Sequence, residues 1–231
     1  MTLGQVPLND PTALRAVLAA TDALLLDFDG PICSVFAGLP ADRVAQRLRD
    51  VLRDDLPAEV EKTEDPFVVL HYAAELGAHE LRAVEAVLRD SEVEAVESAE
   101  PTPGAHDLIR TWPRTGRKLA VVSNNSAAAV HAYLDRTGLL DHIDAVSART
   151  EPAPALLKPA PHLLHQACAR LSVATGRSTL VGDSLTDLEA AKAAHTNAIG
   201  YANKPGKVEL FTAERPEVVI TDMSTLVSAL T

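Results

Sequence analysis

Short, largely apolar runs recur along the chain, and most of them end at glycine or at charged and polar residues. The clearest examples lie at 23–26, 118–122 and 178–181, and weaker ones lie at 143–146, 197–199 and 217–220. Runs of this length between such boundaries are typical of strands that are buried on both faces of a sheet. The pattern therefore predicts a set of buried strands.

Between these runs, apolar residues follow the spacing of amphipathic helices. The predicted helices cover approximately 11–20, 104–115, 126–137, 161–171 and 186–195. The first begins after Asp10, because aspartate caps helices and the proline that follows it suits a first turn. Strands that alternate with helices of this length predict an α/β fold with a parallel sheet.

The segment 37–100 breaks the alternation. It contains no convincing strand, is rich in Arg, Asp and Glu, and predicts helices at approximately 41–53, 66–76 and 78–89. We interpret it as a small helical domain that is inserted after the first strand. The two parts of the α/β core are then 1–36 and 101–231.

Composition narrows the classes of function. The 231 residues include 21 Lys and Arg against 32 Asp and Glu, which gives a net charge of −11 and disfavours nucleic acid and anionic membranes as partners. Aromatic residues make up only 3%, so stacking surfaces for single-stranded nucleic acid are scarce. Two cysteines form no disulfide framework, and the first residues lack the basic region of a signal peptide. These features favour a cytoplasmic protein.

The first predicted strand is followed by two acidic residues, Asp27 and Asp29. Ligands of parallel sheets bind at the carboxyl ends of the strands, and residues two apart in an extended segment point the same way. Two such carboxylates can act as nucleophile and acid–base, or hold a hard cation. An ordinary solvated turn uses the same residue types, so this pair alone leaves both interpretations open.

Polar residues also follow other predicted strands. Asp183 and Asp187 lie at a strand-to-helix junction, where helix capping and a functional role are compatible. Ser123 and Asn124 precede a helix, whose N-terminal N–H groups suit a phosphate oxygen. Lys158 stands between two leucines and a proline and could place a cation beside the carboxylates. Taken singly, Ser123 is better explained as a cap and Lys158 as a loop lysine.

Taken together and in this order, these segments resemble the four motifs of the haloacid dehalogenase-like superfamily. The matching segments are Asp27-Phe28-Asp29-Gly30, Ser123-Asn124, Lys158-Pro159 and Gly182-Asp183-Ser184-x-x-Asp187. The resemblance covers essentially the whole core. The position of the helical insertion is similar to that of the cap in the phosphoglycolate phosphatase and β-phosphoglucomutase branch. The resemblance to the superfamily implies a Rossmann-like core with helices on both faces of the sheet.

The resemblance implies a role for each motif residue. Asp27 would be the nucleophile that forms an aspartyl-phosphate, and Asp29 the general acid and base. Ser123, Asn124 and Lys158 would bind the phosphoryl group.

It also implies a Mg²⁺ site. Asp27, the backbone carbonyl of Asp29 and Asp183 would hold the ion. Asp187 would complete the acidic cluster or orient the lysine.

The activity expected from the resemblance is Mg²⁺-dependent hydrolysis of a small phosphorylated metabolite, a phosphate monoester. A phosphomutase of the same fold is the main alternative, and no feature of the sequence decides between the two. Phosphonate cleavage is less favoured, because Lys62 is the only lysine in the insertion and lies in a polar segment. A non-catalytic binding protein is disfavoured by the complete motif set, and dehalogenation by Asp29. The substrate stays open, and so does the choice between monomer and homodimer.

Overall fold

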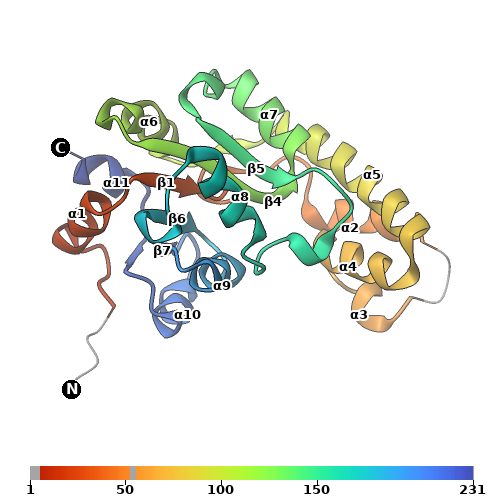
Figure 1. Ribbon diagram of the computed structural model, residues 1–231. Helices are drawn as coiled ribbons and strands as arrows, with labels where there is room; N and C mark the ends of the chain where they lie inside the picture. Colours follow the sequence, from red (N-terminus) through yellow and green to blue (C-terminus); the bar gives the residue numbers. More distant parts are fainter. Residues whose placement is uncertain (1–5, 53–55, 231) are drawn as a thin grey trace.

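A computed structural model describes residues 6–52 and 56–230 (Figure 1). Within these residues, parallel strands form a six-stranded sheet in the order β5-β4-β1-β6-β7-β8. The strands are β1 (Ala23–Leu26), β4 (Lys118–Ser126), β5 (Ala145–Arg149), β6 (Ser178–Gly182), β7 (Asn197–Tyr201) and β8 (Val218–Ile220). The α/β fold with a parallel sheet is confirmed, and β1 lies at its centre between β4 and β6.

Helices cover both faces of this sheet. They are α1 (Pro11–Ala19), α6 (Ala105–Thr111), α7 (Ala127–Arg136), α8 (His162–Leu171), α9 (Leu185–Ala194), α10 (Lys207–Glu214) and α11 (Ser224–Ala229). Shorter 3₁₀ helices are η1 (Trp112–Thr115), η2 (Leu140–His142), η3 (Pro154–Leu156) and η4 (Thr175–Arg177). The expected cap of α1 is present, since the Asp10 carboxylate accepts hydrogen bonds from the first turn.

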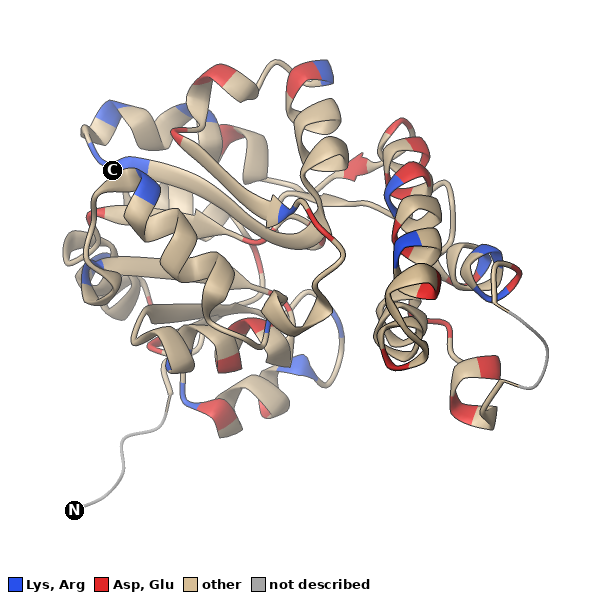
Figure 2. Ribbon diagram, turned by 45° about the vertical axis from the view of Figure 1, so that its right-hand side comes forward, with Lys and Arg blue, Asp and Glu red and all other residues tan. Residues whose placement is uncertain are grey.

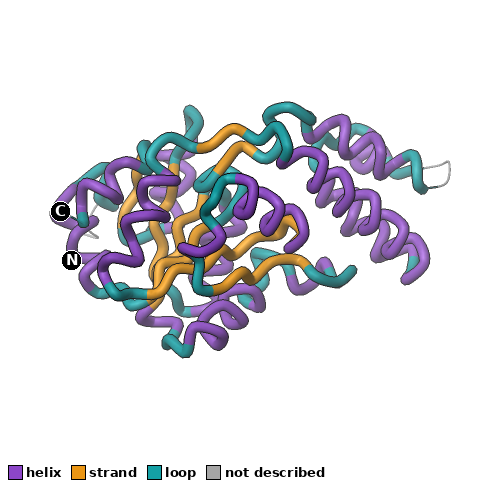
Figure 3. The backbone as a smooth tube through the Cα atoms, turned by 90° about the horizontal axis from the view of Figure 1, so that it is seen from above, coloured by secondary structure: helices purple, strands orange, loops and turns teal. Residues whose placement is uncertain are grey.

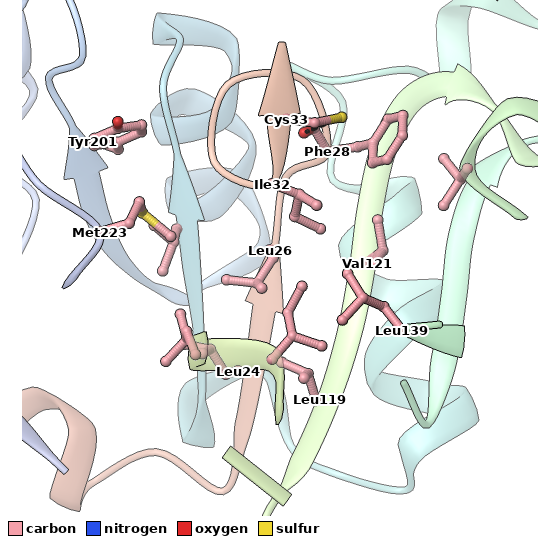
Figure 4. Packing of buried hydrophobic residues seen from close by; sticks show 14 of the residues in the cluster. Leu24, Leu26, Phe28, Ile32, Cys33, Leu119, Val121, Leu139, Tyr201 and Met223 are labelled. Carbon is pink, nitrogen blue, oxygen red and sulfur yellow. Dashed lines mark hydrogen bonds between the residues drawn. The ribbon is translucent and has the colours of Figure 1, made fainter. Parts of the chain in front are cut away.

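Alternate residues of the central strand serve different cores. Leu24 and Leu26 pack with residues of α1, α6, α7 and α11, as Figure 4 shows for part of this cluster. Ala23 and Leu25 join the opposite cluster, to which α8, α9 and α10 contribute. A strand sends successive side chains to opposite faces, so a continuous apolar run is what a sheet covered on both sides requires.

The segment between β1 and α6 contains the helical insertion. A two-stranded antiparallel ribbon, β2 (Cys33–Ser34) and β3 (Glu100–Pro101), lies at its base. Its helices are α2 (Ala41–Arg49), α3 (Ala58–Glu61), α4 (Pro66–Leu76) and α5 (Ala78–Val96). They gather beyond one end of the sheet and carry many charged residues (Figures 2 and 3).

The structure corrects some predicted boundaries. Helix α5 continues seven residues beyond the predicted end at Arg89, because Ser91, Glu92 and Ala95 are buried there and tertiary contacts support an acidic segment. Strand β5 begins at Ala145 rather than at 143. The predicted end of the first inserted helix, at 53, lies outside the described residues; α2 ends at Arg49.

No helix among the described residues has the length and hydropathy needed to cross a membrane.

Candidate active site

The carboxyl ends of three adjacent strands bring the predicted motifs together. Leu26 of β1 pairs with Val121 of β4 on one side and with Val181 of β6 on the other. The residues that follow these pairs therefore lie at the same edge of the sheet. This places Asp27 between the end of β4, which carries Ser123, and the residues after β6, which include Asp183.

Lys158 joins two of the acidic residues. Its Nζ lies 2.7 Å from Oδ1 of Asp27 and 2.5 Å from Oδ1 of Asp187, and it also donates to the carbonyl of Val122 at 3.1 Å. Burial opposes the charge of Lys158, but Asp187 and Asp27 outweigh it and raise the pKa of the ammonium. Burial and the negative charge of Asp187 raise the pKa of Asp27, against the lowering by Lys158. The lysine is thus a fixed, buried countercharge.

The side chain of Asn124 binds the backbone of Lys158. Its side-chain Oδ1 accepts a hydrogen bond from the backbone N of Lys158 at 2.8 Å, and its Nδ2 donates to the carbonyl of Lys158 at 3.0 Å. The amide therefore fixes the lysine backbone. A contact between Asn124 and phosphate, as predicted, would have to come from its backbone N–H.

Three carboxylates form a cluster that could hold a cation. One oxygen from each of Asp27, Asp183 and Asp187 lies within 4.8 Å of the others. Carboxylate oxygens are the ligands that Mg²⁺ prefers. Two glycines make room for the cluster: a Cβ at Gly30 would lie 2.4 Å from Cγ of Asp183, and one at Gly182 would lie 2.3 Å from Cβ of Asp187. The residues present fit a divalent cation.

Asp187 serves the helix and the site at once. Its Oδ2 accepts hydrogen bonds from the backbone N of Ser184 at 3.0 Å and from the Ser184 hydroxyl at 2.6 Å. Ser184 in turn caps α9 through the backbone N of Asp187, which completes a capping box. Capping and a role in the site are therefore compatible, as expected from the sequence, and the capping box orients the oxygen that meets Lys158.

Asp183 is braced by residues that the sequence analysis did not single out. Asn203 donates through Nδ2 to Oδ2 of Asp183 at 2.9 Å, and Nζ of Lys207 lies 2.7 Å from the same oxygen. Both belong to the region between β7 and the first turn of α10. Their position after another strand of the parallel sheet is the feature of the sequence that could have marked them as site residues.

Asp29 lies beside a cavity of about 350 Å³. Its Oδ1 accepts a hydrogen bond from the backbone N of Val35 at 2.9 Å. Desolvation raises the pKa of Asp29 to about 6, against the lowering by that N–H group. A carboxyl group with this pKa can both give and take a proton near neutral pH. The cavity is also lined by Asp183, Ser34, Phe36, Asn203 and Lys204.

Ser123 is buried at the end of the apolar part of β4, and its hydroxyl is held locally. Its Oγ accepts from the backbone N of Asn125 and donates to Oδ1 of Asn125, both at 3.1 Å. Asn125 is itself buried and was not among the predicted residues. The sequence offered only its adjacency to Ser123 as a signal.

Comparisons with known proteins identify a family and several relatives with similar sequences. The sequence profile of the haloacid dehalogenase-like hydrolases matches residues 21–195, which is more than half of the chain. A phosphoglycolate phosphatase of Cupriavidus necator is 34% identical over 112 residues, 47% of this chain and 48% of the relative. An uncharacterized hydrolase of Saccharomyces cerevisiae is 28% identical over 218 residues, 90% of each chain. The matches span about half the length of the curated phosphoglycolate phosphatases (55% and 48%).

The fold also agrees with solved structures. CbbY from Rhodobacter sphaeroides, solved in complex with phosphate, superposes with a TM-score of 0.63 at 21% identity, covering 91% of this chain and 99% of that one. The likeness confirms the Rossmann-like core. Together with the profile match and the order of the motifs along the sheet edge, it leads to one assignment: the chain belongs to the haloacid dehalogenase-like hydrolase family.

Proposed function

We propose that this protein is a Mg²⁺-dependent phosphatase that hydrolyses a small phosphate monoester through an aspartyl-phosphate. The observation that carries the proposal is the convergence of Asp27, Asp183 and Asp187 around Lys158, beside a cavity that contains Asp29. This set combines a nucleophile, a cation site, a countercharge and an acid–base.

Asp27 is the proposed nucleophile. Lys158 holds Oδ1, so Oδ2 is the atom that we expect to attack phosphorus. The bond from this oxygen to phosphorus forms while the bond from phosphorus to the ester oxygen breaks, and the phosphoryl group remains on Asp27 as a mixed anhydride. The intermediate divides one difficult hydrolysis into two displacements.

Asp29 moves the proton in both displacements. It gives its proton to the leaving ester oxygen in the first and accepts one from the attacking water in the second, which releases phosphate and restores Asp27. A pKa of about 6, raised by desolvation, allows both protonation states at neutral pH. Its position on the cavity wall supports a leaving alcohol in that cavity.

Asp27 and Asp183 are the proposed side-chain ligands of Mg²⁺, with the backbone carbonyl of Asp29 and with Asp187 in the same acidic cluster. When bound, the ion would reduce the repulsion between these carboxylates and a phosphate dianion. Ser123 and the backbone N–H of Asn124 would donate to the phosphoryl oxygens, where negative charge is spread in the transition state.

The cavity beside Asp29 suits a small leaving group. Its volume of about 350 Å³ lies at the lower end of the range for small-molecule sites. Its wall combines Phe36 with the cation Lys204 and the polar Asn203. A compact polar metabolite fits this lining better than a polymer.

The proposal predicts that phosphate release depends on a divalent cation. A panel of sugar phosphates, phosphoglycolate and nucleotides is assayed for inorganic phosphate with Mg²⁺ and with EDTA. We expect at least one ester to be hydrolysed, and the rate to fall about 100-fold or more in EDTA. Equal rates under both conditions would refute the cation site, and transfer of phosphate within a sugar without release would identify a mutase.

A second prediction concerns the support of Asp183. In Asn203→Ala the carboxylate loses a neutral donor that fixes its orientation, and we expect cation binding to weaken about tenfold. Titration calorimetry with Mn²⁺ measures this directly, without turnover. The matched control is Asn9→Ala, which removes an exposed asparagine bonded to Thr221. Unchanged Mn²⁺ affinity in Asn203→Ala would show that Asp183 needs no such support.

A further inference from the structure

A buried ion network joins the helical insertion to the core. Arg149, at the end of β5, pairs through Nη1 with Oε1 of Glu85 at 2.5 Å and through Nη2 with Oε2 of Glu92 at 2.6 Å. The side chain of Arg149 is 1% exposed and that of Glu92 is 0% exposed. Both glutamates belong to α5, two helical turns apart, so they share one face of the helix.

The network contains more negative charge than the arginine needs. Two carboxylates face one guanidinium, and burial raises the pKa of Glu92 against the lowering by Arg149 and by the hydrogen bonds from Ser126 and Asn125. Burying unbalanced charge is costly unless hydrogen bonds compensate for it. The partners of Glu92 therefore indicate what the second carboxylate does.

Glu92 binds the end of β4, which carries the proposed phosphate ligand Ser123. Its Oε2 accepts a hydrogen bond from the backbone N of Ser126 at 2.8 Å, and its Oε1 accepts one from Nδ2 of Asn125 at 3.2 Å. Arg149 adds a bond from Nε to the carbonyl of Asn124 at 3.2 Å. Three consecutive residues after Ser123 are thus held by one ion pair.

Asn125 transmits this constraint to Ser123. A carboxylate only accepts hydrogen bonds, so the NH₂ end of the Asn125 amide must face Glu92. The amide oxygen consequently faces Ser123, and the hydroxyl of Ser123 donates to it. The backbone N–H of Asn125 occupies one lone pair of the same hydroxyl. Both hydrogen-bond partners of the Ser123 hydroxyl thus come from Asn125, which fixes the position of Oγ at the end of the sheet.

We propose that Glu92, acting through Asn125, is a positioning residue that orients the Ser123 hydroxyl for phosphate, and that Arg149 holds Glu92 in place. The inference rests on the proposed function, because it assigns Ser123 to the phosphoryl group. Its consequence is that part of the phosphate site is supported by α5, a helix of the insertion. Displacement of this helix from the core weakens phosphate binding.

The test measures binding of inorganic phosphate in the presence of Mg²⁺ by titration calorimetry, together with KM and kcat for an ester that the wild type hydrolyses. The variants are Glu92→Gln, Asn125→Ala and the double variant. We expect each single variant to weaken phosphate binding about tenfold. We expect the double variant to match the single variants within about twofold, because both changes break the same relay.

Two further variants separate positioning from a general structural role. Arg136 also connects α7 to the insertion, by a bond from Nη2 to the carbonyl of Val96 at 2.8 Å, but it is the last residue of α7 and lies at the opposite end of that helix from Asn125 and Ser126. Arg136→Met is expected to keep wild-type phosphate affinity. Arg149→Lys is expected to retain part of the affinity that Arg149→Met loses, since the ammonium keeps a charge beside Glu92.

The outcomes are distinct. Wild-type phosphate affinity in Glu92→Gln and Asn125→Ala, even with a lower melting temperature, would overturn the inference. The proposed phosphatase function would not be affected by that result. A loss of about 100-fold in the double variant would show that Glu92 does not act through Asn125. Should Glu92→Gln fail to fold, Asn125→Ala decides alone. A wild type that binds no phosphate and hydrolyses no ester would refute the proposed function itself.

Discussion

Replacing Asp27 by asparagine is expected to lower the rate of ester hydrolysis about 10⁴-fold or more. The amide has nearly the same shape, but it is not a nucleophile and cannot carry the phosphoryl group. The residue also loses the charge that faces Lys158 at 2.7 Å. Phosphate release at saturating ester measures the rate. Mass spectrometry of quenched wild type should find one phosphoryl group on the peptide that contains Asp27, and none in the variant.

Asp22→Asn is the matched control for this experiment. Asp22 immediately precedes β1 and pairs with Arg177 at the surface, so it lies at the opposite end of the strand that carries Asp27. Its replacement should leave turnover within a factor of about two, because exposed ion pairs contribute little. Full activity in Asp27→Asn would rule out the aspartyl-phosphate pathway.

Lys158→Met is expected to reduce both stability and turnover. The lysine separates Asp27 and Asp187, and its removal leaves two carboxylates facing each other in a buried site. Breaking a buried pair in this way costs about 3–5 kcal/mol of the free energy of unfolding. Urea unfolding measures the loss. Added Mg²⁺ should recover part of it in the variant, because a divalent cation supplies the missing positive charge.

The control here is Lys118→Met. Lys118 pairs with Asp144 at 2.8 Å on the surface, with half of the lysine side chain exposed. We expect a change of at most about 1 kcal/mol in the free energy of unfolding. Similar losses in the two variants would mean that Lys158 is an ordinary structural lysine rather than the countercharge of the acidic cluster.

The sheet could be predicted because its signal is local. Each buried strand contains a short, largely apolar run, and in β1 the run is uninterrupted and alternate residues enter the two cores on either side. Parallel strands bring their carboxyl ends to one edge of the sheet. The convergence of Asp27, Ser123 and Asp183 could therefore be predicted without knowing the conformation of the loops. Strands β2 and β3 could not be predicted in the same way, because each has two residues and is defined only by its partner.

The support of the site depends on contacts between distant segments. Glu92 is 33 residues from Asn125 and lies in an acidic run that looks like an exposed helix end, yet it is fully buried. Asn203 follows a strand but carries no charge that would mark it. The contact of Asn124 with phosphate stays a prediction, and the bonds of its side chain to the backbone of Lys158 could not be foreseen. Such roles follow from packing, which a single sequence does not reveal.

The ribbon of β2 and β3 bears on which helices of the insertion can change independently of the core. Cys33 pairs with Pro101 and Ser34 with Glu100, so the chain leaves and rejoins the core at one point, with its two segments about 5 Å apart. Asp29 precedes the ribbon, so we expect changes in the helices beyond it to leave the position of Asp29 largely unaffected. The inner face of α5 is different, because Asn125 and Ser126 bond to the carboxylate of Glu92. We therefore expect helices α2 to α4 to tolerate replacement better than the inner face of α5.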